Sequence, residues 1–203
     1  MALSIDIRVL ELLAARLCHD LAGPIAAITN GAELLDDEDP DFVRQAGTLI
    51  GDSAGTAAKR LQLFRFVYGF SAGAIVGPPP HLLASEYLAG GSVTCDYREA
   101  ARPLEGPWQR LGCALLLVAG EGLPRGGRIC LDAAGAAVAV IADGEGARLS
   151  DEATAALLLQ TPVETLSSRT VGAYFAGLLA RQLDHRLKAA TQASGFCISC
   201  EKL

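Results

Sequence analysis

The chain has 203 residues, of which 51% are hydrophobic and 20% are charged, and its formal net charge is -6 at pH 7. This composition excludes a disordered chain, and a negative charge without any block of Lys or Arg argues against nucleic-acid binding. The longest apolar runs are far shorter than the roughly 20 residues that a membrane span requires. Asp6, Arg8 and Glu11 also interrupt the N-terminal apolar pattern. We therefore expect a cytoplasmic protein that neither crosses a membrane nor carries a secretion signal.

The first predicted element is a long helix from about Ser4 to Leu35. Its apolar residues recur at steps of three and four, the period of a helix that buries one stripe. The stripe consists of Leu10, Leu13, Leu17, Leu21, Ile25, Ile28, Ala32 and Leu35. His19 lies off this stripe, because each residue turns the helix by roughly 100° and both Leu17 and Leu21 are two positions away. The imidazole is therefore expected to face solvent or a partner.

The surface around His19 combines small side chains with charge. The residues three and four positions away on the same surface are Ala15, Arg16, Ala22 and Gly23. The three small residues allow a second molecule to approach the ring closely, and the arginine can reach a phosphoryl oxygen. Asp20 follows the histidine directly and can orient one imidazole nitrogen, which sets the tautomer at the other. Pro24 removes a backbone donor and crowds the carbonyl of Asp20, so the helix should bend just beyond His19.

A second long helix is expected after a short acidic turn, with Asp39 as the N-cap and Pro40 at the first helical position. Two long helices joined by a short turn form an antiparallel hairpin. Glycines at 47, 51 and 55 each cost about 1 kcal/mol relative to alanine in a helix, which indicates that something packs closely on that face. A lone hairpin cannot cover its apolar stripe, whereas two copies can do so as a dimeric four-helix bundle.

Residues 71–80 are rich in Gly and Pro and are predicted to link the hairpin, residues 1–70, to a second domain, residues 81–203. Within that domain, helices are predicted at 81–89, 108–120, 151–159 and 171–183, and strands at 93–97, 128–132, 137–142, 186–190 and 196–200. Helices combined with a largely antiparallel set of strands favour a two-layer α/β sandwich.

The sequence around the histidine resembles a known family. Cys18-His19-Asp20-Leu21-x-x-Pro24, followed by Asn30-Gly31-x-Glu33-Leu34-Leu35, is similar to the phospho-accepting box of bacterial histidine kinases. It is most similar to the version in the ChpT family of alphaproteobacterial histidine phosphotransferases. The C-terminal domain of that family is also similar to this chain at residues 115–117, 123–127 and 174–181. The resemblance implies a homodimer in which each His19 faces outward, followed by a degenerate ATP-binding-like domain of the Bergerat type.

The resemblance also implies that nucleotide chemistry is lost. A kinase of this kind needs an asparagine for magnesium, but that position holds Val118, which cannot ligate a hard cation. Asp143-Gly144-Glu145-Gly146 keeps the nucleotide-loop residues at shifted spacing, and residues 167–172 replace the phosphate loop. We expect no bound cofactor and no metal site, with magnesium supplied by the receiver-domain partner. Cys197-x-x-Cys200 has no second pair to complete a zinc site.

The leading hypothesis is a histidine phosphotransferase of a multistep phosphorelay that is not an ATP-dependent autokinase. His19 would carry the phosphoryl group and Asp20 would set its tautomer. The expected phosphoryl or partner contacts are Arg16, Ala15, Ala22, Gly23, Pro24 and Asn30. The partners would be response-regulator receiver domains, including that of a hybrid histidine kinase. The alternatives are a non-catalytic dimeric module that sequesters a response regulator, and an active autokinase.

Overall fold

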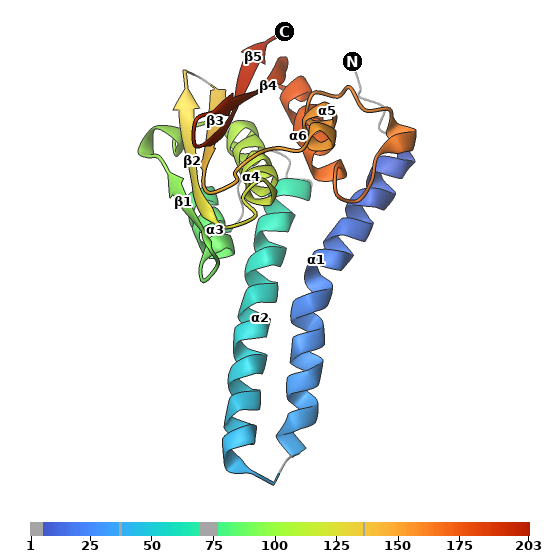
Figure 1. Cartoon of the computed structure of the whole chain (residues 1–203), viewed down its shortest axis with the longest axis vertical. Helices are drawn as coiled ribbons and strands as arrows, with labels where there is room; N and C mark the ends of the chain where they lie inside the picture. Colours follow the sequence, from blue (N-terminus) through green and yellow to red (C-terminus); the bar gives the residue numbers. More distant parts are fainter. Residues whose placement is uncertain (1–5, 37, 70–76, 136) are drawn as a thin grey trace.

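The computed structural model describes residues 6–36, 38–69, 77–135 and 137–203. It shows a long helical hairpin that projects from an α/β domain (Figure 1). The hairpin consists of α1 (Ile7–Glu33) and α2 (Pro40–Tyr68). The predicted linker falls largely outside the described residues, and the chain is described again from residue 77. The predicted order of a helical hairpin followed by an α/β domain is confirmed.

The ends of the hairpin helices follow capping chemistry. In α1 the N-cap is Asp6, whose side chain accepts a hydrogen bond of 2.8 Å from the Arg8 amide, so the helix starts later than the predicted cap at Ser4. After α1, Leu34–Asp36 forms a 3-10 turn. The start of α2 is as predicted, because Asp39 accepts a 2.9 Å bond from the Asp41 amide and proline occupies the first turn.

The two helices of the hairpin approach each other closely at Gly31, where an added Cβ would lie 2.7 Å from Cγ1 of Ile50. The predicted apolar stripe is covered only in part, since Leu13 is buried while Leu10 is 54% and Ile25 53% exposed. The glycines at 47, 51 and 55 have no atom within 4 Å of an added Cβ in the described chain. One side of the hairpin therefore remains apolar and open within a single copy.

The α/β domain contains a five-stranded mixed sheet in the order β1-β2-β3-β5-β4. Its elements are α3 (Pro80–Leu88), β1 (Val93–Tyr97), α4 (Gly106–Glu121), β2 (Gly127–Ala134), β3 (Ala137–Asp143), α5 (Asp151–Leu157), α6 (Val171–Gln182), β4 (His185–Gln192) and β5 (Gly195–Lys202), with short 3-10 turns at Glu99–Ala101 and Val163–Thr165. Only the β1–β2 pair is parallel among the strand pairs of this sheet. The predicted α/β sandwich with a largely antiparallel sheet is confirmed.

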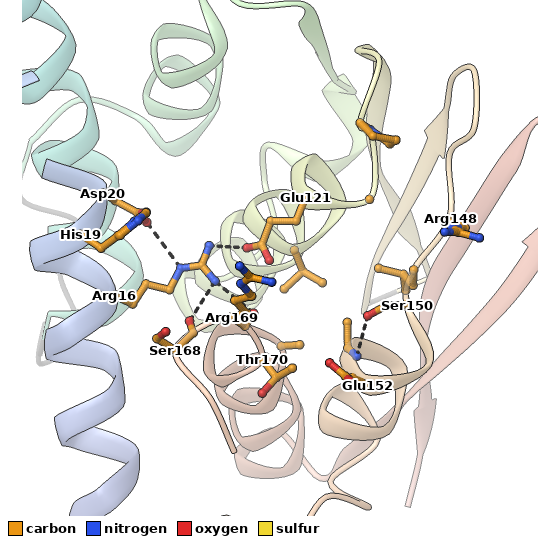
Figure 2. A pocket seen from close by; sticks show the side chains of 16 residues that line it. Arg16, His19, Asp20, Glu121, Arg148, Ser150, Glu152, Ser168, Arg169 and Thr170 are labelled. Carbon is orange, nitrogen blue, oxygen red and sulfur yellow. Dashed lines mark hydrogen bonds and ion pairs between the residues drawn. The ribbon is translucent and has the colours of Figure 1, made fainter. Parts of the chain in front are cut away.

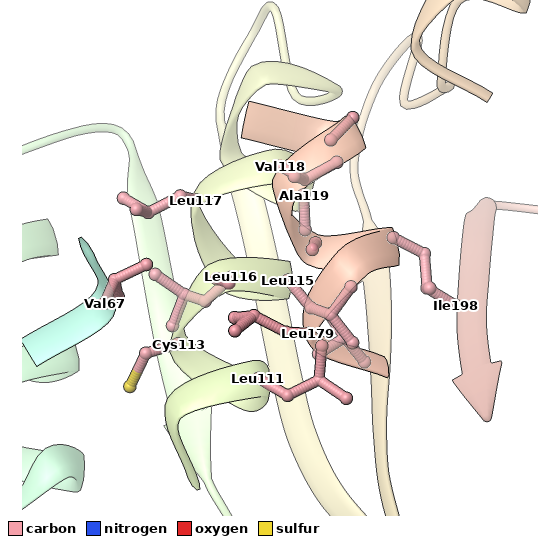
Figure 3. Packing of buried hydrophobic residues seen from close by; sticks show 14 of the residues in the cluster. Val67, Leu111, Cys113, Leu115, Leu116, Leu117, Val118, Ala119, Leu179 and Ile198 are labelled. Carbon is pink, nitrogen blue, oxygen red and sulfur yellow. The ribbon is translucent and has the colours of Figure 1, made fainter. Parts of the chain in front are cut away.

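The core of this domain lies between the sheet and α4 with α6 (Figure 3). Leu111 and Leu115 of α4 and Ile198 of β5 are fully buried. The close approach of α4 to the sheet requires glycine at 112, because an added Cβ would lie 3.0 Å from Cδ1 of Leu131 and 3.1 Å from Cγ2 of Val138. Tight packing of α4 fixes the position of its C-terminal end, which reaches toward the hairpin.

The upper end of the hairpin shares this core, because Val9, Leu13 and Phe64 belong to the same buried cluster. Two arginines add hydrogen bonds across the junction. Arg8 donates to the carbonyl of Val163 at 3.1 Å, and Arg110 donates to the carbonyl of Val67 at 2.7 Å. The junction therefore holds the hairpin against the α/β domain at the level of the first turns of α1.

By length and composition, the segment Ile7–Asp36 is the one stretch of the described chain apolar enough to cross a membrane, with a mean hydropathy of 1.2. One such helix is weak evidence, because helices with an apolar face for a protein partner pass the same test. Arg8 and Arg16 in this segment hydrogen-bond to the α/β domain.

Candidate functional site

His19 lies on α1 with its imidazole in solvent, since the side chain is 88% exposed. Its Nδ1 lies 3.3 Å from Oδ1 of the adjacent Asp20. In the tautomer with hydrogen on Nδ1, this nitrogen donates to the carboxylate and Nε2 carries the free lone pair. Nε2 makes no hydrogen bond to any described residue. The geometry therefore leaves one ring nitrogen open to a second molecule.

Arg16 lies one turn before His19, and its side chain is only 17% exposed. Its Nε lies 3.4 Å from Oδ2 of Asp20, and its Nη1 donates to the carbonyls of Ser168 and Arg169 at 3.3 and 3.2 Å. Its Nη2 pairs with the carboxylate of Glu121. Burial is the largest single influence and opposes its charge, but the attraction of Glu121 and Asp20 and the hydrogen bond to Glu121 together outweigh burial and raise the pKa of Arg16. Arg16 is thus a cation that bridges the histidine helix and the α/β domain.

Asp20 also makes a backbone contact across the hairpin. Pro24 lies inside α1 and has no amide hydrogen, so it cannot donate to the carbonyl four residues earlier. The carbonyl of Asp20 instead accepts a hydrogen bond from Nη1 of Arg60 on α2. The helix passes through the proline unbroken, and Figure 1 shows that α1 bends along its length.

The other predicted contact residues lie around His19 as expected from a continuous helix. Ala15, Ala22 and Gly23 are exposed, and no atom of the described chain lies within 4 Å of an added Cβ at Gly23. Asn30 is also exposed. Eleven residues correspond to three turns and about 16 Å of helix, so Asn30 lies on the same face as His19 at a distance from it.

His19, Asp20 and Arg16 line one side of a cavity of about 610 Å³ between α1 and the α/β domain (Figure 2). The other walls come from the end of α4, the segment before α5 and the segment before α6. The lining residues from these walls include Val118, Glu121, Arg148, Ser150, Glu152, Ser168, Arg169 and Thr170. The side chains of Arg148 and Arg169 have no ion pair among the described residues. The cavity wall opposite α1 thus carries two guanidinium groups and the carboxylate of Glu152 without an ion pair among the described residues, and Arg148 lies on the far side from His19 (Figure 2).

Two of the three positions that the resemblance assigns to nucleotide binding line this cavity, and the third does not. Val118 and residues 168–170 line it, but Asp143 is not among the lining residues. Asp143 ends β3 and accepts a 2.6 Å hydrogen bond from the Ser194 hydroxyl. Among the described residues, no group of three or more His, Cys, Asp or Glu side chains is arranged to hold a metal ion.

Reasoning from the sequence missed three residues of the site, namely Arg60, Glu121 and Arg169. Each reaches the site through the tertiary fold. Glu121 and Arg169 lie more than 100 residues from Arg16 in the sequence, and Arg60 lies 40 residues from Asp20. The only local signal was at Pro24, whose position indicates a carbonyl in need of an outside donor.

A surface histidine on a helical hairpin, followed by this α/β domain, matches a defined class of signalling protein. Residues 81–195, more than half of the chain, match the family described as the histidine phosphotransferase C-terminal domain. The chain therefore belongs to this histidine phosphotransferase family.

Two relatives extend the match over the full length. The protein phosphotransferase ChpT of Brucella abortus (strain 2308) is 26% identical over 211 residues, covering 99% of this chain and 100% of the relative. A solved structure described as a bacterial phosphotransferase superimposes with a TM-score of 0.84 at 28% identity, covering 99% of this chain and 98% of that one. The predicted resemblance to the ChpT family is thus confirmed.

Proposed function

We propose that the chain is a histidine phosphotransferase of a bacterial multistep phosphorelay. His19 accepts a phosphoryl group from the phosphoaspartate of a receiver domain and passes it to a response regulator. One observation carries this proposal, namely that an exposed His19 stands beside Asp20 at the edge of a cavity in a chain of this family.

In the proposed reaction, Nε2 of His19 attacks the phosphorus in line. The N–P bond forms while the P–O bond to the receiver aspartate breaks, and the aspartate leaves as a carboxylate. The carboxylate of Asp20 accepts a hydrogen bond from Nδ1–H and so keeps the tautomer in which Nε2 is the nucleophile. The reverse steps, with a second receiver, release the group. The magnesium ion for both steps belongs to the receiver domain.

The surface around His19 supports close docking of such a partner. Ala15, Ala22 and Gly23 present no bulky side chain, Pro24 follows them on α1, and Asn30 extends the contact surface along the helix. Arg16 is the proposed source of positive charge for the phosphoryl oxygens, and reaching them requires its guanidinium to exchange one of its present contacts for the phosphoryl group. Arg169, which has no ion pair among the described residues, suits a negatively charged group on the partner.

We further propose that the functional unit is a homodimer in which the open apolar side of the hairpin packs against a second copy. This side, called the apolar face below, includes Leu10, Ile25 and Ala32 of α1 and Gly47 and Leu61 of α2, all exposed in one copy. On α1 it lies on the side away from His19 by helical geometry. Its packing as a four-helix bundle would leave each His19 accessible.

Transfer of an acid-labile label tests the proposal. The chain is mixed with Mg²⁺ and a panel of phosphorylated receiver domains from its own organism, and compared with His19→Ala. The chain holds only three histidines, so His81→Ala and His185→Ala are matched controls. We expect label on the wild type and on both controls but not on His19→Ala. The label should then move to a second receiver domain when one is added.

Two outcomes separate the other functions. If no receiver that binds the chain transfers its phosphoryl group to it, the proposal is wrong and a sequestering dimer is the better account. Label taken from ATP without a phosphorylated donor would instead establish an autokinase.

A further inference from the structure

The hydrogen bond that Pro24 removes from α1 is replaced from the neighbouring helix. An amide at position 24 would donate to the carbonyl of Asp20 in a regular helix, but proline has none. Nη1 of Arg60 donates to that carbonyl across the hairpin. A half-buried carbonyl left without a donor is unfavourable, and a charged donor makes a stronger bond than a neutral one.

The same residue, Asp20, makes the contacts that orient His19. Its Oδ1 lies 3.3 Å from Nδ1 of His19, and its Oδ2 lies 3.4 Å from Nε of Arg16. Arg60 therefore holds the backbone of the residue whose carboxylate faces the histidine. A shift of this turn would move the imidazole and the carboxylate together.

We propose that Arg60 is a positioning residue for phosphoryl transfer, which holds the turn of α1 that carries His19 by donating to the carbonyl left open by Pro24. The proposal rests on the proposed function of His19. It assigns Arg60 no contact with the phosphoryl group, because its guanidinium donates to the Asp20 carbonyl, on the side of α1 that faces α2. Small displacements of a nucleophile from the in-line geometry slow transfer strongly.

The variant Arg60→Met removes the donor and keeps the length of the side chain, while Arg60→Lys retains a charged donor. Lys59→Met is the matched control, because Lys59 is the adjacent cation on α2, is exposed and has no partner among the described residues. At saturating phosphorylated receiver we expect Arg60→Met to slow transfer by about tenfold. We expect Arg60→Lys to recover part of the rate and Lys59→Met to match the wild type. The receiver concentration that gives half the maximal rate should not change.

Pro24→Ala distinguishes positioning from a general loss of structure. Alanine restores the amide that can donate to the Asp20 carbonyl within α1. In a Pro24→Ala background, Arg60→Met should therefore slow transfer by less than about threefold relative to Pro24→Ala alone, the coupling expected when two groups serve one acceptor. Equal slowing in both backgrounds, or an Arg60→Met rate equal to that of Lys59→Met, would overturn the proposal.

A measurement without phosphate keeps the two proposals separable. The carbonyl ¹³C chemical shift of Asp20 reports directly on the bond that this oxygen accepts. It should move in Arg60→Met and stay unchanged in Lys59→Met. An unchanged shift in Arg60→Met refutes the role of Arg60 even if His19 is labelled. The other outcome is a changed Asp20 chemical shift in Arg60→Met together with a wild type that accepts no label. It would show that the function of His19, and not the contact of Arg60, was assigned incorrectly.

Discussion

At the scale of single residues, the site is organised by Asp20, which faces His19 with one carboxylate oxygen and Arg16 with the other. The outward direction of His19 could be predicted from the sequence, because it depends only on the helical period around one residue. Arg60 and Glu121 could not be predicted, because they lie 40 and 105 residues from their partners and only the folded chain brings them together.

The role of Arg16 can be separated from its structural contacts. Arg16→Ala is expected to slow phosphoryl transfer to His19 by about tenfold, because it removes a guanidinium one turn from the nucleophile. Glu121→Gln is the matched control, since it weakens the same ion pair between α1 and α4 but retains the guanidinium. Single-turnover transfer rates decide the matter. If both variants slow transfer equally, Arg16 acts only through the junction.

At the scale of elements, the sequence predicted the start of α2 and the existence of all five strands. Asp39 with Pro40, and the apolar runs bounded by Gly and Pro, are local signals that the tertiary structure did not override. The start of α1 was misplaced because Ser4 and Asp6 are both short polar residues that can serve as an N-cap. The incomplete coverage of the apolar stripe agrees with the expectation that a lone hairpin cannot cover it, since Leu10 and Ile25 remain more than half exposed.

Packing within the hairpin is expected to depend on Gly31. Gly31→Val would place side-chain atoms against Ile50, because the added Cβ alone would lie 2.7 Å from Cγ1 of Ile50. We expect the free energy of unfolding to fall by about 2 kcal/mol, the usual cost of overpacking. Urea unfolding followed by circular dichroism measures it. Gly23→Val serves as a comparison at an open position, and an equal loss in both variants would contradict the close contact.

At the scale of the whole molecule, the proposed dimer makes different predictions for two leucines of α2. Leu61 and Leu49 are 50% and 40% exposed, and their spacing sets them about 120° apart around the helix. Leu61→Glu on the apolar face is expected to dissociate the dimer, whereas Leu49→Glu is expected to leave it intact. Sedimentation equilibrium distinguishes them. A monomeric wild type, or a Leu61→Glu dimer as stable as the wild type, would contradict the proposed interface.

The junction between the hairpin and the α/β domain is expected to weaken at high pH through Tyr68. Burial raises the pKa of Tyr68 to about 12, and its ring packs against Phe175 at 5.3 Å between centroids. A pKa raised on folding gives stability that is complete below the unfolded value near 10 and is lost as the pH rises toward 12. Tyr68→Phe should therefore gain stability relative to the wild type over that range, by up to roughly 2 to 3 kcal/mol. Urea unfolding of both proteins at pH 9 and pH 11 measures the difference, and a constant difference would refute the assignment.

The site of phosphorylation tests the central claim most directly. The chain is incubated with Mg²⁺ and a phosphorylated receiver, digested under alkaline conditions that preserve phosphohistidine, and mapped by tandem mass spectrometry before and after addition of a second receiver. We predict phosphate on His19 alone, with loss of that phosphate when the second receiver is added. Phosphate on His81 or His185, or an unphosphorylated His19 in a chain that has bound the receiver, would contradict the assignment of His19 as the phosphoryl carrier.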